Sequence, residues 1–157
     1  EQHEAQSIES DSTDVFNRIN VLQDKLLNLN FAIDDDFETE VINQFMKEIF
    51  AEAKALKILN TQIGARENGK EFAACANELI CEIETLNLEL SQLSVYKIKM
   101  LDPEQYNEYE GTAEEYADYI ESNYYTPMNY QITRSYPKLN QLKNQLNEFC
   151  NELKIRA

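Results

Sequence analysis

The feature that most constrains this chain is the stretch from Lys70 to Leu101, where apolar residues recur at alternating intervals of four and three. The members of the series are Phe72, Ala76, Leu79, Ile83, Leu86, Leu90, Leu93 and Met100, and Lys97 takes the one polar place. This spacing predicts a long helix with one apolar seam. Such a helix is not stable alone in water, so the seam predicts partner helices that bury it.

Three other segments repeat the spacing and supply the expected partners. The first follows the candidate N-caps Asp11, Ser12 and Thr13, with the seam Val15, Ile19, Leu22, Leu26, Leu29 and Ile33. The second runs from about Phe37 to Ile63, with the seam Ile42, Phe45, Ile49, Leu56, Leu59 and Ile63. The last has Leu139, Leu142, Leu146, Phe149 and Leu153; it either starts at Pro137 or starts near Pro127 and kinks at Pro137.

These segments predict an all-α fold. Short connections between the first three helices make antiparallel neighbours, so we expect an up-down antiparallel four-helix bundle. A short acidic, tyrosine-rich helical insertion, residues 102–136, is expected between the third and last long helices, with Thr112 and Glu115 as a capping box for a helix at about 113–125. Residues 1–10 are expected to be a disordered leader before a single helical-bundle domain over residues 11–157.

The formal net charge of −15 is concentrated in two parts of the chain. Residues 1–36 hold nine Asp and Glu against Arg18 and Lys25, and residues 102–125 hold eight acids and no Lys or Arg. A field of this sign repels nucleic acid and anionic membranes and favours basic partners. We therefore expect another protein with a basic surface as the partner, no nucleic acid and no membrane insertion, and we leave a homo-oligomer open.

Eight of the nine tyrosines fall within residues 102–136, interleaved with the acids. Tyrosine and charge together are typical of the core and rim of protein interfaces. An alternative interpretation is a lid whose aromatic rings pack on the bundle. The candidate partner-binding residues are Tyr106, Glu108, Tyr109, Glu110, Glu114, Glu115, Tyr116, Asp118 and Tyr119.

Motifs that carry catalysis or bind metal do not occur in this sequence. The single histidine is His3, and there is no Glu-x-x-His, GxSxG or CxxC motif. The string GxxxxGK at Gly64–Lys70 follows a predicted helix instead of a strand and precedes Glu71 instead of Ser or Thr, so it predicts a turn with Gly64 as a left-handed helix stop. We therefore expect no enzyme activity, no cofactor and no metal site.

The three cysteines are Cys75, Cys81 and Cys150. An up-down bundle would bring Cys75 and Cys150 to nearly the same layer, which predicts a disulfide between them. The alternative is that both are small buried residues in a reducing compartment.

The sequence therefore favours a non-catalytic helical-bundle protein that acts through protein–protein contact by its segment 102–136. The alternative is an acidic, charge-based inhibitor, immunity or mimic protein that docks on a basic partner. Regulation by tyrosine modification is a third hypothesis, since acids flank Tyr106, Tyr109 and Tyr116. We expect a soluble protein, either secreted or periplasmic after removal of a leader, or cytoplasmic.

Overall fold

The computed structural model describes residues 2–35, 39–93 and 112–156. Within these residues there is no strand, and the long helices are α1 (Gln2–Asp34), α2 (Thr39–Gly64), α3 (Lys70–Gln92) and α7 (Thr126–Arg156). A 3-10 turn, η1 (Glu67–Gly69), joins α2 to α3. The short helix α6 (Ala113–Ile120) and the π-helical segment η2 (Glu121–Tyr125) lead directly into α7. The predicted all-α class is confirmed.

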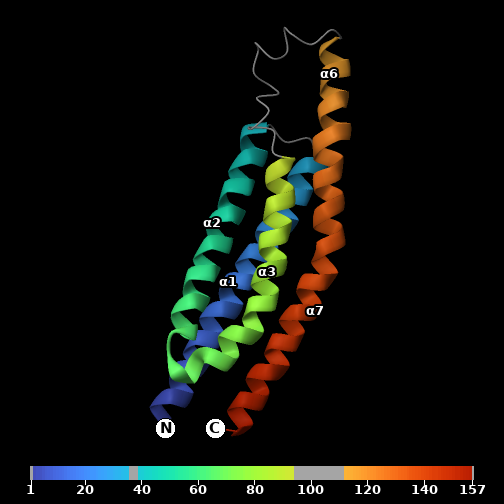
Figure 1. The fold of residues 1–157 in the computed structure, drawn as a ribbon. Helices are drawn as coiled ribbons and strands as arrows, with labels where there is room; N and C mark the ends of the chain where they lie inside the picture. Colours follow the sequence, from blue (N-terminus) through green and yellow to red (C-terminus); the bar gives the residue numbers. More distant parts are fainter. Residues whose placement is uncertain (1, 36–38, 94–111, 157) are drawn as a thin grey trace.

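The long helices lie side by side along their lengths and form one bundle (Figure 1). Helices α1 and α3 each contact both α2 and α7, so all four surround a common centre. The N- and C-termini lie at the same end of the bundle. At the opposite end, α6 prolongs α7 past the other helices.

The core is formed by the apolar seams of the four long helices. The predicted seam of α1 is buried from Val15 to Ile33, and that of α3 is buried from Phe72 to Leu90. The remainder of the predicted third helix, residues 94–101, lies outside the described residues. Each of these side chains contributes roughly 1.5–3 kcal/mol by leaving water, which is why the seams decide the arrangement.

On α2 and α7 most of the predicted seam is buried, and the buried residue differs by one position at a few steps. In α2, Met46 is buried in place of Phe45, which packs half-buried at the edge of the core. In α7, Cys150 is buried and Phe149 is half-buried. The predicted seam residues that are buried are Ile42, Ile49, Leu56 and Ile63 of α2 and Leu139, Leu142 and Leu146 of α7.

The first helix starts earlier than predicted, because α1 begins at Gln2 and includes most of the expected leader. Ser12 Oγ and Thr13 Oγ1 donate to the carbonyl of Glu9 at 3.0 and 2.9 Å. Their side chains therefore bond backward within the helix instead of capping its start. No Gly or Pro precedes Gly64, so no strong helix breaker opposes the extension.

The last helix starts before Pro137. Of the two predicted starts, the structure has the one near Pro127, because α7 begins at Thr126 and Pro137 lies inside it. Met128 and Ile132 are buried, so the turns before Pro137 belong to the core. Residues 113–136, predicted as part of an insertion, are here continuous with the last helix.

A polar network joins α7 to α1. Gln23, which is buried, donates through Nε2 to Asn140 Oδ1 at 2.7 Å and accepts at Oε1 from Lys143 Nζ at 2.7 Å. Lys143 Nζ also donates to Asn20 Oδ1 at 3.2 Å. Satisfied polar groups between apolar seams fix the position of one helix along another.

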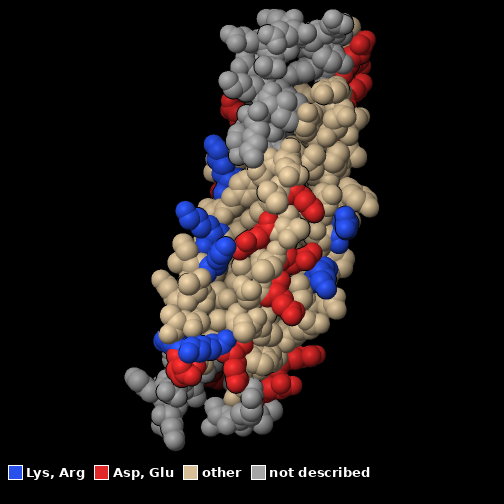
Figure 2. Space-filling view, in the orientation of Figure 1, with Lys and Arg blue, Asp and Glu red and all other residues tan. Residues whose placement is uncertain are grey.

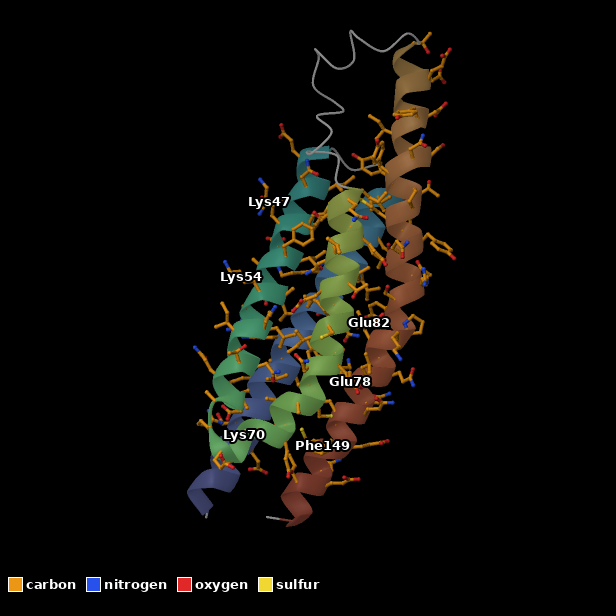
Figure 3. The ribbon with its side chains drawn as sticks, viewed as in Figure 1. Lys47, Lys54, Lys70, Glu78, Glu82 and Phe149 are labelled. Carbon is orange, nitrogen blue, oxygen red and sulfur yellow. The ribbon has the colours of Figure 1, made fainter. Side chains whose placement is uncertain are left out.

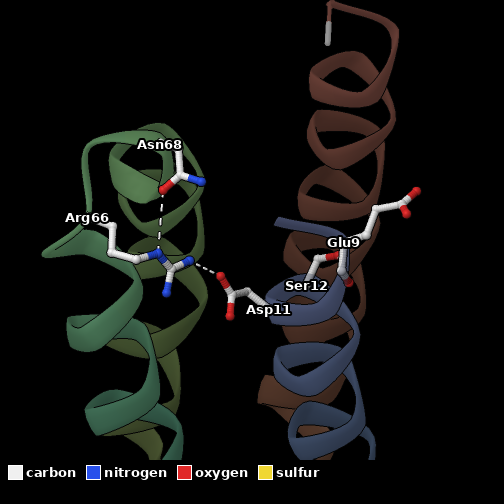
Figure 4. A network of polar contacts seen from close by, with 5 residues as sticks. All are labelled: Glu9, Asp11, Ser12, Arg66 and Asn68. Carbon is white, nitrogen blue, oxygen red and sulfur yellow. Dashed lines mark hydrogen bonds and ion pairs between the residues drawn. The ribbon is translucent and has the colours of Figure 1, made fainter. Parts of the chain in front are cut away.

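The α2–α3 turn is fixed to the first helix by charge. Arg66 donates through Nη2 to Asp11 Oδ2 and through Nε to Asn68 Oδ1 at 3.4 Å, as Figure 4 shows. Gly69 N donates to Arg66 O at 3.1 Å, which closes the turn. The GxxxxGK string therefore forms a turn after a helix, as predicted. Gly64, however, is the last residue of α2 and is not left-handed.

Candidate interaction surfaces

One half of the predicted capping box, the N-cap bond of Thr112, starts α6. Glu115 N donates to Thr112 Oγ1 at 3.1 Å, which satisfies one of the helix-terminal N–H groups. Glu114 and Glu115 in this first turn suit the positive end of the helix dipole. Local helix formation therefore accounts for these two acids, but not for the acids further along.

The predicted partner-binding residues divide into two sets. Glu114, Glu115, Asp118 and Tyr119 lie on α6 with exposed side chains, and Tyr116 also belongs to this helix. The other four, Tyr106, Glu108, Tyr109 and Glu110, lie outside the described residues. The structure thus brings one part of the predicted set together on a single helix.

The π-helical segment η2 carries α6 as a continuation of α7. Thr126 N donates to Glu121 O, five residues back, and Asn123 Nδ2 donates to Tyr119 O at 2.8 Å. Wider turns of this kind occur as short pieces within α-helices, often at functional sites. Pro127 follows at once, and its ring requires extra room beside the carbonyl four residues earlier. The wider turn supplies that room without ending the helix.

The acidic charge of α6 and η2 is exposed and local. Glu114, Glu115, Asp118 and Glu121 are all exposed, and the sequence has no Lys or Arg from residue 102 to residue 133. Figure 2 shows Asp and Glu side chains gathered at this end of the molecule, over α6. We call these four residues the acidic tip. Its surroundings have a negative potential because no basic side chain of the same segment compensates it.

An aromatic side chain accompanies the acidic tip. Tyr119 is 43% exposed, and its ring meets that of Tyr124 edge-on, with the centroids 6.2 Å apart and the planes at 69°. The edge-to-face contact limits the freedom of the Tyr119 ring while leaving much of its surface accessible. An ordered, exposed aromatic side chain beside charges is a common anchor in protein interfaces.

The outer face of α2 has the opposite charge. Lys47, Ala51, Lys54 and Ile58 are exposed at intervals of four, three and four residues, so they form one line along the helix. Figure 3 shows Lys47 and Lys54 pointing away from the bundle, and Figure 2 shows basic side chains along this edge of the molecule. The nearby acids of α2, Glu48 and Glu52, pair instead with Lys25 and Arg18 of α1 at 3.7 and 3.9 Å.

A shallow groove of about 450 Å³ lies next to this basic line, between α2 and α3. Phe50, Ala53 and Leu88 give it an apolar lining, and Leu88 is 62% exposed. Lys57 Nζ and Glu84 Oε1 form an ion pair across the groove at 3.0 Å. The remaining lining residues are Lys54, Asn87 and Ser91.

Sequence reasoning did not find this groove. Its lining comes from two helices, and the spacing of residues within one helix does not show how a neighbouring helix packs beside it. The available signal was the spacing of Lys47, Lys54 and Ile58, which share one face of α2 about 110° around the axis from the buried Met46 and Ala53.

The structure records Cys75, Cys81 and Cys150 as thiols, so the predicted Cys75–Cys150 disulfide is not formed here and stays a prediction. Cys150 is buried, Cys75 is half-buried and Cys81 is exposed. Burial, and secondarily the negative charge of Glu78, raise the pKa of the Cys75 thiol. Since the thiolate is the reactive form, Cys75 is a poor nucleophile near neutral pH.

The described side chains include no group of three or more His, Cys, Asp or Glu that could hold a metal ion. Among the same residues, none of the helices has the length and apolar character needed to cross a lipid bilayer. Comparison with protein-family models, curated proteins and solved structures finds no match to this chain. Two surfaces remain as candidates for function. One is the acidic tip, and the other is the α2–α3 groove together with Lys47 and Lys54 beside it, which we call the basic groove.

Proposed function

We propose that this chain is a non-catalytic binding protein that docks on a basic protein surface through the acidic tip. The observation that carries the proposal is the position of α6, which continues α7 past the bundle, with four exposed acids on α6 and η2 and the exposed ring of Tyr119 on α6. Asp118 and Glu121 lie beyond the first turn, where helix capping does not account for them. A helix held on a rigid support loses little conformational entropy when it binds.

The charge of the acidic tip and the ring of Tyr119 contribute to binding in different ways. The negative potential of the acidic tip steers a basic partner toward it and raises the association rate. The Tyr119 ring supplies apolar contact area once the partner arrives. The electrostatic effect predicts that binding weakens as salt screens the charges, because the Debye length is about 10 Å at 0.1 M ionic strength.

The proposal includes the finer topology, an up-down antiparallel bundle. It is supported by the pairing of α1 with α2, in which Arg18 meets Glu52 while Lys25 meets Glu48. Residue numbers that rise on one helix while they fall on the other are expected of antiparallel neighbours. Asn20 with Lys143 and Asp34 with Asn129 follow the same rule for α1 and α7.

The test is a binding measurement with a defined basic probe. A lysine-rich helical peptide is titrated into the full chain, and a glutamate-rich peptide of equal length serves as the opposite probe. We expect only the lysine-rich peptide to bind, with a Kd about tenfold weaker at 300 mM than at 50 mM salt. The variant E114Q/E115Q/D118N should bind about tenfold more weakly, since three charges are lost. The backbone N–H of residue 115 still donates to Thr112 Oγ1 in this variant, and Gln is as suitable as Glu at this position of a capping box.

A matched control separates local charge from total charge. The variant E78Q/E148Q/E152Q also removes three exposed acids, but these lie on α3 and α7. We expect it to bind the lysine-rich peptide nearly as well as the unmodified chain. Equal weakening in both triple variants would show that only the net charge matters, and would refute docking through the acidic tip.

A further inference from the structure

We propose that the basic groove between α2 and α3 binds the acidic tip of a second copy of this chain. The inference rests on the proposed function, because it uses the acidic tip as the docking element, and it names the partner. Two complementary surfaces of one molecule, placed far apart, favour association between copies.

The basic side of the contact is available for an incoming acid. Within the described residues, neither Lys47 nor Lys54 has an ion pair, and the Lys57 side chain is 61% exposed although it meets Glu84. The acids that could neutralise this face, Glu48 and Glu52, are paired with α1 instead. The outer face of α2 is thus basic in a chain whose net charge is −15.

The spacing of the lysines on α2 matches the spacing of two acids of the acidic tip. Lys47 and Lys54 are seven residues apart on α2, and Glu114 and Glu121 are seven residues apart on the α6–η2 helix. Seven residues correspond to about 10.5 Å along an α-helix. Two helices laid side by side can therefore form both ion pairs at once.

The apolar lining lies beside the basic line. Phe50, Ala53 and Leu88 line the groove, and the small side chain of Ala51 leaves room between Lys47 and Lys54. Asp118 shares the face of the docking helix that carries Glu114 and Glu121, because residues three and four positions apart are neighbours on a helix. Tyr119 lies about 140° around the axis from Glu114, so the proposed contact is carried by charge.

Within the described parts of the chain, the acidic tip of one copy does not reach its own groove. The helix α6 continues α7 beyond the end of the bundle, while the groove lies along α2 and α3 (Figure 1). The acidic tip and the groove are thus different surfaces. Their contact is made twice in a two-fold dimer, or once per pair of copies in a ring or an open chain, depending on the rotation between copies.

The experiment uses sedimentation of the full chain over a range of concentrations at 50 and 300 mM salt. We expect concentration-dependent association at low salt that weakens at least about tenfold at high salt. The groove variant K47E/K54E and the tip variant D118K/E121K should each be monomeric, because each opposes like charges. The tip variant leaves the first turn of α6 unchanged, where a lysine would oppose the helix dipole.

Mixing the two variants is the decisive measurement. The intact tip of the groove variant can dock on the intact groove of the tip variant, so the mixture should associate although neither component does alone. The control R134E/K138E makes the same charge change at two exposed positions of α7 and should associate like the unmodified chain. Circular dichroism of every variant checks that the helices are retained.

The outcomes separate this inference from the proposed function. If K47E/K54E still associates while D118K/E121K does not, the tip docks elsewhere: the groove assignment is refuted and docking by the tip survives. If the unmodified chain is monomeric at 50 mM salt, self-association is refuted, and the lysine-rich peptide alone tests the proposed function. If both variants associate like the unmodified chain, neither surface mediates self-association, and the inference is refuted.

Discussion

Gly69 has less room for a side chain than Gly64, the other glycine among the described residues. It is buried in the turn between α2 and α3, and a Cβ atom there would meet the carbonyl oxygen of Ile63 and lie 2.8 Å from Ile63 Cγ2. The backbone angles are ordinary, with φ −100 and ψ −7. The position therefore requires Gly because of the close approach of the α2 backbone, and not because of an unusual conformation.

We predict that Gly69→Ala lowers the free energy of unfolding by about 1–3 kcal/mol, the usual cost of forcing atoms into a packed site. The measurement is chemical denaturation followed by circular dichroism. Gly64→Ala is the control, since its Cβ would lie 3.1 Å from the Ala73 Cβ, a contact that a small shift relieves. An equal or smaller loss in Gly69→Ala than in Gly64→Ala would contradict the steric account.

At this scale the sequence predicts which residues are apolar, but not every residue that is buried. It identifies the seams of α1 and α3, whose predicted residues from Val15 to Ile33 and from Phe72 to Leu90 are buried. It fails where two adjacent residues compete, as Phe45 and Met46 do, because the winner depends on the rotation of the helix. It also misses Asn60, which is buried on the α2 seam and donates through Nδ2 to Ala73 O at 3.0 Å.

Among the elements, the last helix departs most from sequence expectation. Pro137 lies inside α7, where it removes the bond to the carbonyl of Thr133 and places its ring against that carbonyl. The helix continues because Ile132 and Leu139, on either side, are both buried in the core. Tertiary packing here overrides a residue that would end an isolated helix.

We predict that Pro137→Ala raises the free energy of unfolding by about 1–3 kcal/mol, because an interior helical Pro costs roughly 3 kcal/mol relative to Ala. Thermal unfolding measures the change. Pro127→Ala is the comparison, and its gain should be smaller, since the wider η2 turn already accommodates that ring. A destabilised Pro137→Ala protein would mean that the bundle requires the proline at this position.

The element boundaries could be predicted only in part. The turn at 64–70 and the cap at Thr112 were predicted from residues whose chemistry acts locally. The start of α1 and the continuity of α6 with α7 were not, because helix propagation across weak signals is cooperative and depends on packing. The sequence predicts an acidic, tyrosine-rich segment at residues 102–136. The structure adds that the acidic tip within it lies on one helix, with its four side chains exposed.

For the whole molecule, the net charge of −15 opposes the compact state through self-repulsion. The ion pairs among the described residues lie at least partly in solvent, so each offsets little of it. We predict that raising NaCl from 50 to 500 mM increases the free energy of unfolding by about 1 kcal/mol, measured by denaturation at a protein concentration low enough to prevent association.

The control for this prediction is the same salt series near pH 4.4, the isoelectric point of the sequence. The net charge is then close to zero, so salt should change the stability much less. A decrease of stability with salt at pH 7 would show that attractive pairs outweigh the repulsion between acids.

The π-helical turn at Glu121–Tyr125 sets the direction in which the acids of α6 face. Its hydrogen bond spans five residues instead of four, so the helix holds one residue more than a regular turn would. One residue corresponds to about 100° around the axis and about 1.5 Å along it. The segment therefore acts as an angular offset: losing one residue there would turn the acidic face by more than a quarter of a revolution relative to the bundle while leaving its composition almost unchanged.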